Sequence, residues 1–437
     1  MSAPGAAETP LKGLRIVTTI PPHPWFGGID YNFAIEMTEE LRLLGAEVFE
    51  LHIGSFITNN EIYIRDSIQA LKAFRPKVAL PVPNALYALL CRDGAHNIFK
   101  DILQIPTIML WDHGLLQLPQ QILGPLPNRP EDSAGGSIRR LKQVLDHPLF
   151  IHYSLDRGHI DALDKLGVLD RAKVQFFLQP AYPNFVRYGY RAAPANAYRT
   201  RVAFAGNVYV KGAEALPFRN IPGLGEIEAR VLAAKKNRLT ECFWDLILSE
   251  IEALDGPTRK RLRLDPNYTF FWQFMHEEIE LVGNTEARLG VLTALKREFD
   301  FFGNFVEPDA VATLRDRYRM KFRKSLDYFT ELPLLFINSD VIVDVVNLGY
   351  NTGVSPKIMG CFACGGLVLF DYKSDFHQSM GDLGAEVMYR NLDQLNSMVD
   401  EYLANPRKRR EVSRYLQHRV ATEFNFAALS RKILAGL

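Results

Sequence analysis

A predicted helix start near residue 356 has the residue types of an anion-binding site. Ser355 is a preferred N-cap and Pro356 a preferred first helical residue, so a helix should begin there. Its first N–H groups lack partners inside the helix and attract an anion such as a nucleotide diphosphate. Lys357 is unfavourable beside the positive end of the helix dipole unless such an anion docks there. The candidate diphosphate-binding residues are Gly353, Val354, Ser355 and Lys357; the equal alternative is a capped structural helix with a solvated lysine.

Asp112 and His113 directly follow an apolar strand predicted at 107–111. A strand that ends at the rim of a parallel sheet presents such side chains to a cleft. Histidine titrates near neutral pH, and a neighbouring carboxylate can orient it and raise its basicity. The pair is therefore a candidate catalytic base for an acceptor hydroxyl. The alternative is a rim pair that only hydrogen-bonds its own loop.

Gly27 and Gly28 predict a loop after the first strand, on the side of a cleft where an acceptor substrate would bind. There the backbone could approach a sugar or phosphate closely. The surrounding FGGID lacks the spacing G-x-G-x-x-G, so a dinucleotide-binding fingerprint is absent. Cys361 and Cys364 have no second Cys or His pair at zinc spacing, and we interpret them as small helix residues packed against a sheet. No metal site is expected.

Strands that alternate with helices must position these residues. Such alternation predicts parallel sheets with helices on both faces. The expected strands are 14–20, 46–53, 77–81, 107–111, 149–153 and 174–178 in a first series, and 201–205, 298–302, 334–337 and 366–371 in a second.

The pattern predicts an α/β protein with two doubly wound, Rossmann-like domains that face a cleft. A helical insertion enlarges the second domain. The C-terminal helix is expected to pack back towards the N-terminal domain. The predicted boundaries are a disordered leader 1–11, a first domain 12–188, a linker 189–200, a second domain 201–415 with the insertion at 224–293, and the C-terminal helix 416–437.

Opposite charges balance in the 437-residue chain, with 51 Lys and Arg against 50 Asp and Glu. The net charge of +1 excludes a globally basic surface of the kind that binds nucleic acid. No apolar run approaches the roughly 18 residues that span a bilayer. The first ten residues lack the pattern of a secretory signal. Because four scattered cysteines make no disulfide framework in a chain this long, the expected location is the cytoplasm.

Residues 290–435 contain a series of motifs with a familiar order. A short helix is followed by Ala-Cys-Gly-Gly at 363–366, an apolar strand that ends at Asp371, and the stretch 384–389. The tail continues with 402–407 and an Arg-rich helix. This series resembles the C-terminal domain of group 1 glycosyltransferases, and most of all their spore-maturation-protein (CgeB-like) branch. The similarity is weaker over the N-terminal half.

The resemblance implies a GT-B fold, with the active site between two Rossmann-like domains. It implies sugar transfer from a nucleotide donor, usually without an essential metal. On this resemblance, Asn207 and Lys211 correspond to the first strand and basic loop of the donor domain. Lys211 would neutralise a phosphate as a point charge, although a lone loop lysine is more often solvated. The sequence contains no Asp-x-Asp, which counts against the metal-dependent, single-domain glycosyltransferase fold.

The sequence departs from that family at two functional positions. Retaining members carry two glutamates eight positions apart, and these positions are Thr352 and Gly360 here. An arginine that is frequent in the branch is Lys357 in this chain. The usual roles of the glutamates, holding the donor sugar and the ribose, therefore have no support in the sequence.

The sequence thus predicts a glycosyltransferase that moves a sugar from a nucleotide-sugar donor to a glycan, a lipid-linked sugar or a protein. No cofactor is expected, since the nucleotide sugar is a substrate. One alternative is a non-catalytic nucleotide- or glycan-binding protein of the same fold, motivated by the missing glutamates. A Rossmann oxidoreductase or epimerase is a further alternative that the absent fingerprint disfavours. No nucleic-acid partner is expected, whereas a peripheral membrane contact and a homo-oligomer stay open.

Overall fold

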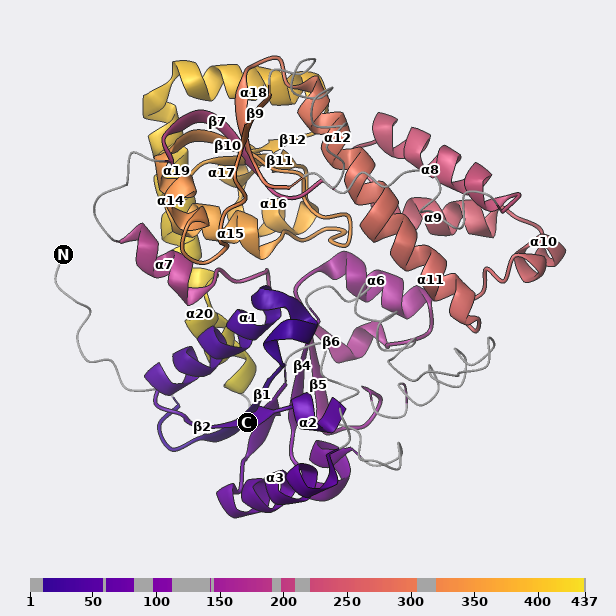
Figure 1. The fold of residues 1–437 in the computed structure, drawn as a ribbon, viewed down its shortest axis with the longest axis vertical. Coiled ribbons are helices and arrows are strands. Elements are labelled where there is room, and N and C mark those ends of the chain that lie inside the picture. The colour runs from indigo at the N-terminus through magenta and orange to yellow at the C-terminus, as the bar shows by residue number, and fades with distance from the viewer. Residues whose placement is uncertain are drawn as a thin grey trace.

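Two all-parallel sheets, one above the other in Figure 1, organise the chain. The computed structural model describes residues 11–57, 60–81, 97–111, 142, 145–190, 198–208, 221–304 and 320–435. Within these ranges each sheet has six strands, and every strand pair is parallel. The prediction of an α/β fold with two Rossmann-like sheets is confirmed.

The first sheet has the strand order β2-β1-β3-β4-β5-β6. Its central strands are short and buried on both faces, which is the signature of a parallel sheet covered by helices. The strands are β1 (Arg15–Ile20), β2 (Glu47–His52), β3 (Val78–Leu80), β4 (Thr107–Trp111), β5 (Phe150–Ser154) and β6 (Val174–Phe176).

Helices and single turns connect these strands. Asn60 begins α3 and Asp156 begins α6, each with a side-chain oxygen that accepts a backbone N–H of the first turn. The elements are α1 (His23–Leu43), α2 (Gly54–Ile57), α3 (Glu61–Phe74), η3 (Ile98–Leu103), α6 (Arg157–Lys165), η4 (Arg171–Lys173) and α7 (Pro183–Gly189).

The second sheet has the order β12-β11-β10-β7-β8-β9. Its first strand, β7, lies between β10 and β8, so the strand order reverses there. In open α/β sheets, ligands bind at the carboxyl ends of the strands beside such a reversal. The strands are β7 (Thr200–Ala205), β8 (Phe299–Phe302), β9 (Met320–Arg323), β10 (Ser339–Val343), β11 (Val368–Asp371) and β12 (Met388–Tyr389).

Helices between β7 and β8 extend to one side of the molecule (Figure 1). Phe271, Trp272 and Phe274 are buried there, so the aromatic residues of α11 form part of a hydrophobic core. Whether this region is an insertion stays a prediction. Its elements are α8 (Leu224–Asn237), α9 (Phe243–Glu252), α10 (Gly256–Arg261), α11 (Thr269–Glu277), η7 (Glu278–Gly283) and α12 (Asn284–Ala294).

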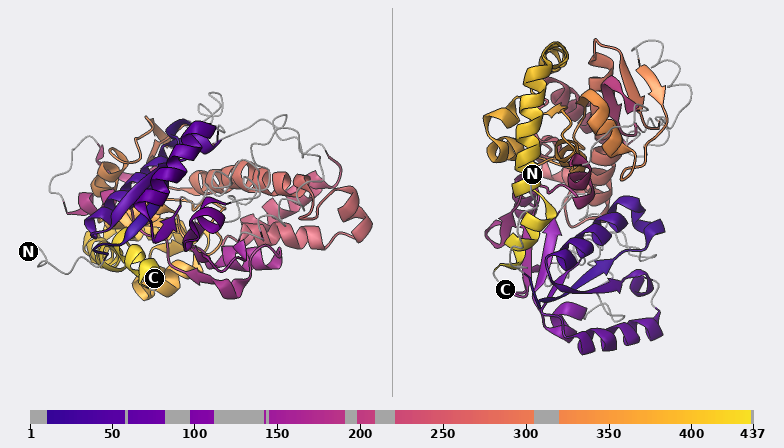
Figure 2. Two further views of the ribbon diagram at one scale, coloured as in Figure 1. Left: turned by 90° about the horizontal axis from the view of Figure 1, so that it is seen from below. Right: turned by 90° about the vertical axis from the view of Figure 1, so that its left-hand side faces the viewer.

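The C-terminal helices run from the second sheet down to the first (Figure 2). Phe426 of the last helix packs edge-on against Phe33 of α1, with ring centroids 5.1 Å apart. Ala181 pairs with Asn425 beside this contact. The domain boundaries themselves stay predictions. The remaining helices are α14 (Leu332–Asn338), α15 (Pro356–Ala363), α16 (Ser374–Met380), α17 (Asp382–Ala385), α18 (Leu392–Ala404), α19 (Pro406–Glu423) and α20 (Phe426–Leu434).

One predicted strand is wrong. The apolar run 334–337 belongs to helix α14, and the strand of this region is β10, directly after it. Pro333 lies in the first turn of α14, where its fixed φ favours a helix start. A short apolar run does not distinguish a buried helix from a buried strand, which explains the error.

The loop predicted at Gly27 and Gly28 is also wrong, because both glycines lie inside α1. Pro24 stands in the first turn of this helix and Pro22 is its N-cap, so the helix begins before the glycines. Glycine inside a helix costs about 1 kcal/mol relative to alanine. Burial of Phe33 and Met37 further along α1 offsets that cost.

No helix in the described part of the chain is long and apolar enough to cross a membrane.

Candidate functional site

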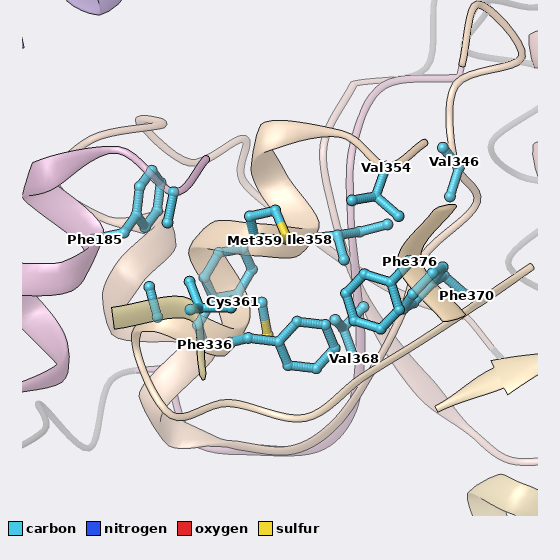
Figure 3. Close-up of a cluster of buried hydrophobic side chains, with 14 of the residues drawn as sticks. Phe185, Phe336, Val346, Val354, Ile358, Met359, Cys361, Val368, Phe370 and Phe376 are labelled. Carbon is cyan, nitrogen blue, oxygen red and sulfur yellow. The ribbon is translucent and has the colours of Figure 1, made fainter. Parts of the chain in front are cut away.

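Helix α15 begins at the carboxyl edge of the second sheet, beside the reversal of strand order. Its core side is anchored by Ile358, Met359 and Cys361, all completely buried (Figure 3). Phe185 of α7 lies against the same helix in Figure 3. The helix start is therefore held rigidly at the carboxyl edge of the sheet, where ligands of this kind of fold bind.

Ser355 is the N-cap residue of α15, as the sequence predicts, but its hydroxyl caps nothing. The backbone is extended, with φ −75° and ψ 156°, and the carbonyl accepts from the N–H of Ile358 at 3.1 Å. The Oγ atom is shielded from solvent and has no hydrogen-bond partner among the residues that the structure describes. An N-cap hydroxyl normally accepts an N–H of the first turn. The Ser355 hydroxyl is therefore a hydrogen-bonding group that the described residues leave unused.

Lys357 extends from the first turn of α15 to the ends of two strands. Its Nζ donates to the carbonyl of Ala205 at 2.8 Å and pairs with Asp344 at 2.6 Å. The lysine is thus neither solvated nor unpaired, and it joins the ends of β7 and β10. Burial raises the pKa of Asp344, and the charges of Lys357 and Arg288 only partly oppose that rise. A stronger anion could consequently replace Asp344 as the partner of Lys357.

Arg288 of α12 is a second cation at this edge that the sequence reading missed. Its Nη1 donates to the carbonyl of Asn207 at 2.7 Å. The Asn207 side chain in turn accepts from the N–H of Asn304 at 3.1 Å. No local motif marks Arg288, because it lies 81 positions after Asn207 in the sequence. Only the packing of α12 beside β7 brings the two together.

The loop before α15 uses its N–H groups differently from the prediction. Gly353 donates its N–H to Oδ2 of Asp156 at 2.9 Å, and Asn351 donates to the same atom at 2.7 Å. The N–H of Thr352 lies 3.1 Å from each carboxylate oxygen. Asp156 follows β5 in the first half of the chain. The predicted role of Gly353 as a phosphate ligand is thus unsupported, since a carboxylate of this protein already holds its N–H.

The charge of His159 and several hydrogen bonds together decide the ionisation of this completely buried carboxylate. Burial raises the pKa of Asp156, but the charge of His159 and the bonds from Gly353 and Thr352 outweigh burial. The net shift of the pKa is downward. Asp156 is therefore an anion at neutral pH, held in a nest of backbone N–H groups.

The two positions of the missing glutamates have other contacts. The hydroxyl of Thr352 lies 2.8 Å from Asp156 and 2.7 Å from Asp375, and it can donate to one of them at a time. A Cβ at Gly360 would lie 3.0 Å from the ring of Phe185. A longer side chain at Gly360 would therefore displace Phe185, and the hydroxyl of Thr352 already contacts carboxylates of this protein.

Several predicted site residues lie outside the described residues, namely Asp112, His113 and Lys211. Strand β4 ends at Trp111, directly before Asp112 and His113 in the sequence. The indole N–H of Trp111 donates to Nδ1 of His152 at 3.2 Å. Val354 is buried next to Ser355 and presents no polar side chain. Among the described residues, no three His, Cys, Asp or Glu side chains gather where a metal ion could bind. The prediction of metal independence stays a prediction.

Two doubly wound sheets in one chain, with a ligand edge on the second, define the GT-B class of fold. Residues 287–435 match the family model described as glycosyl transferase-like. This match covers less than half of the chain and supports the predicted resemblance over that part. The finer resemblance to the CgeB-like branch stays a prediction.

Solved structures of this class match nearly the whole chain. Anabaena Alr3699/HepE in complex with UDP and glucose has a TM-score of 0.50 and 11% identity, over 97% of this chain and 100% of that chain. An alpha-glucosyltransferase in complex with UDP has a TM-score of 0.50 and 8% identity, over 96% and 99% of the two chains. At such identities the likeness shows the fold. No curated protein sequence matches this chain.

Proposed function

We propose that this protein is a glycosyltransferase that uses a nucleotide-sugar donor. The observation that carries the proposal is the start of α15, at the carboxyl edge of a Rossmann-like sheet. There the described residues leave the shielded Ser355 hydroxyl without a partner, and Lys357 and Arg288 bring two positive charges to the same edge. The match of residues 287–435 to glycosyl transferase-like sequences supports it. So does a GT-B fold whose solved examples include one in complex with UDP and glucose.

In this proposal the diphosphate of the donor binds at the α15 start. The Ser355 hydroxyl and the backbone N–H of Lys357 would hold phosphate oxygens, since Pro356 has no N–H and Ile358 donates its own to the carbonyl of Ser355. Lys357 would turn from Asp344 towards the diphosphate, and Arg288 would add a second positive charge. These charges would stabilise the diphosphate as it leaves the sugar. No cofactor takes part, and the nucleotide sugar is consumed as a substrate.

The acceptor would enter from the edge of the first sheet. Asp112 and His113, directly after β4, remain the proposed base for its hydroxyl, with Lys211 as a further phosphate contact. The acceptor classes are a glycan, a lipid-linked sugar or a protein. Three free cysteines in the described residues support the proposed cytoplasmic location.

Thermal shift with UDP, UDP-glucose, GDP and ADP tests the donor site. A bound nucleotide should raise the melting temperature. Ser355→Ala and Arg288→Ala should each weaken that effect. Arg297→Ala, at the opposite edge of the second sheet, is the matched control and should leave it unchanged. If none of the nucleotides raises the melting temperature at millimolar concentration, the proposal is wrong.

A non-catalytic nucleotide-binding protein is the second candidate. Gly360 is packed against the ring of Phe185, and the hydroxyl of Thr352 lies between two carboxylates of this protein. Neither position supplies the carboxylate of the family's glutamates, which favours this candidate. A donor-hydrolysis and sugar-transfer assay on a nucleotide-binding preparation separates the two. Binding without turnover of any donor or acceptor would establish the non-catalytic function. Stabilisation by a dinucleotide alone would instead favour the oxidoreductase.

A further inference from the structure

The start of α6, in the first half of the chain, is bound to the loop that precedes the proposed donor site. Asp156 accepts the N–H groups of residues 351–353, and Arg157 pairs with Asp375 of α16 at 3.0 Å. His159 also bonds the carbonyl of Gly349. Asp156 and His159 thus bind the 349–353 loop of the other half, and Arg157 between them binds α16 of the same half, over separations of 190 to 218 positions.

These contacts between the start of α6 and the 349–353 loop require a very close approach of the two backbones. A Cβ at Gly158 would lie 2.4 Å from the Cβ of Asn351, and a Cβ at Gly353 would lie 2.8 Å from the carbonyl oxygen of Leu155. Real Cβ atoms are not found at such distances. Glycine at both positions allows the carboxylate of Asp156 to reach the loop, so the position of the loop is set by the first half of the molecule.

We propose that Asp156 is a positioning residue for the donor site. Its carboxylate orients the N–H groups of 351–353, and the chain then enters Ser355 and α15 from a fixed direction. Donor affinity would consequently depend on contact between the two halves. This role rests on the proposed function, because it acts on the site proposed there.

The alternative roles of Asp156 make different predictions. A purely structural carboxylate would lower stability when replaced, and the affinity of the folded variant for nucleotide would not change. A carboxylate that competes with phosphate for the loop would, when neutralised, let nucleotide bind more tightly. The measured direction of the affinity change therefore decides between them.

Isothermal titration of UDP, with GDP and ADP in parallel, provides the test on the full chain. Asp156→Asn keeps the shape of the side chain but removes its charge, and the dissociation constant should rise about tenfold. Asp164→Asn makes the same charge change on the exposed side of α6 and should bind like the wild type. All titrations are made well below the melting temperature of each variant.

Three further variants keep the test decisive if Asp156→Asn fails to fold. Gly158→Ala forces the loop away without any change in charge, and it should weaken binding as Asp156→Asn does. Thr352→Val removes the hydroxyl between the two carboxylates, whereas Thr352→Ser keeps it and should restore affinity. Affinity that is unchanged or increased in Asp156→Asn or Gly158→Ala overturns the role. If the wild type binds no nucleoside diphosphate, the proposed function fails, and this role with it.

Discussion

Two buried carboxylates, one in each half of the molecule, have opposite surroundings. Asp156 follows β5 of the first sheet and Asp344 follows β10 of the second, and both are almost completely buried. The pKa of Asp156 is lowered, because backbone N–H groups and His159 outweigh its burial. The pKa of Asp344 is raised, because burial outweighs the charges of Lys357 and Arg288. The same residue type is therefore a fixed anion in one place and an exchangeable partner in the other.

The two carboxylates differ in how firmly their partners are held. Several N–H···O bonds from one loop hold the carboxylate of Asp156 in place. Asp344 is paired instead with the flexible side chain of Lys357. A fixed contact thus lies next to an ion pair whose cation would have to change partner in the proposed donor site.

Glu36 of α1 is an intermediate case. Its carboxylate accepts one N–H, from Asn184 at the start of α7, at 2.9 Å. Burial is the largest influence and raises the pKa of Glu36 from 4.5 to about 7, although Asn184 and Arg187 lower it. One hydrogen bond and one nearby charge are thus not enough to keep a buried carboxylate ionised.

The largest effect on stability is expected for Asp156→Ala. The substitution leaves three loop N–H groups buried without an acceptor, so the free energy of unfolding should fall by about 3–5 kcal/mol. Urea denaturation at pH 7 measures it. Asp164→Ala, on the exposed side of the same helix, should change the free energy by less than about 0.5 kcal/mol. A loss of similar size in the two variants would remove the contrast between Asp156 and an ordinary surface carboxylate.

Glu36 should make stability depend on pH. Its pKa is raised in the folded state, so its contribution is fully present below pH 4.5 and is lost as the pH rises through about 7. The loss should approach about 3 kcal/mol. Glu36→Gln, which stays neutral, should remove this part of the pH dependence in urea titrations, whereas the exposed Glu39→Gln should not. Identical profiles for the wild type and Glu36→Gln would contradict the raised pKa.

Asp344→Asn should cost far less stability than the changes at Asp156. The folded protein already disfavours the ionised form of Asp344, and Lys357 keeps its bond to the carbonyl of Ala205. We expect a loss of about 1 kcal/mol. Because Lys357 then lacks its anionic partner, the affinity for UDP should increase, measured by calorimetry. A stability loss as large as that of Asp156→Asn would break the comparison of the two carboxylates.

The smallest change in stability is expected for Ser355→Ala. Its hydroxyl has no partner among the described residues, so the free energy of unfolding should change by less than about 0.5 kcal/mol. The affinity for UDP should nevertheless fall, because one hydrogen bond to phosphate is lost. Glycine at this position would also alter the backbone, so alanine is the clearer substitution. Loss of stability with unchanged affinity would show that the hydroxyl serves the fold.

Much of the fold could be predicted because parallel strands leave a local signal. Runs of buried β-branched residues, such as those of β1 and β4, were located almost to the residue. The run that became α14 failed, since burial alone does not distinguish a short helix from a short strand. The loop predicted at Gly27 and Gly28 was wrong because tertiary packing of α1 overrode the weak helix propensity of glycine.

The candidate site divides in the same way. Ser355 and Lys357 were found from the pattern of a helix start, which is local. Arg288 and Asp156 carried no such signal, since each acts on residues far away in the chain. The assignment of Gly353 to phosphate was reasonable for an isolated loop, but it could not take account of a carboxylate from the other half.

The sequence by itself determined the class of fold, the start of α15 and the cation in its first turn, because each depends on neighbours within a few residues. Only the tertiary structure decided the partners of those groups. The carboxylate in the loop, the arginine beside Asn207 and the ring over Gly360 come from segments about 80 to 195 positions away. Backbone propensity acts over a few residues, whereas burial and charge act between whichever side chains the fold brings together.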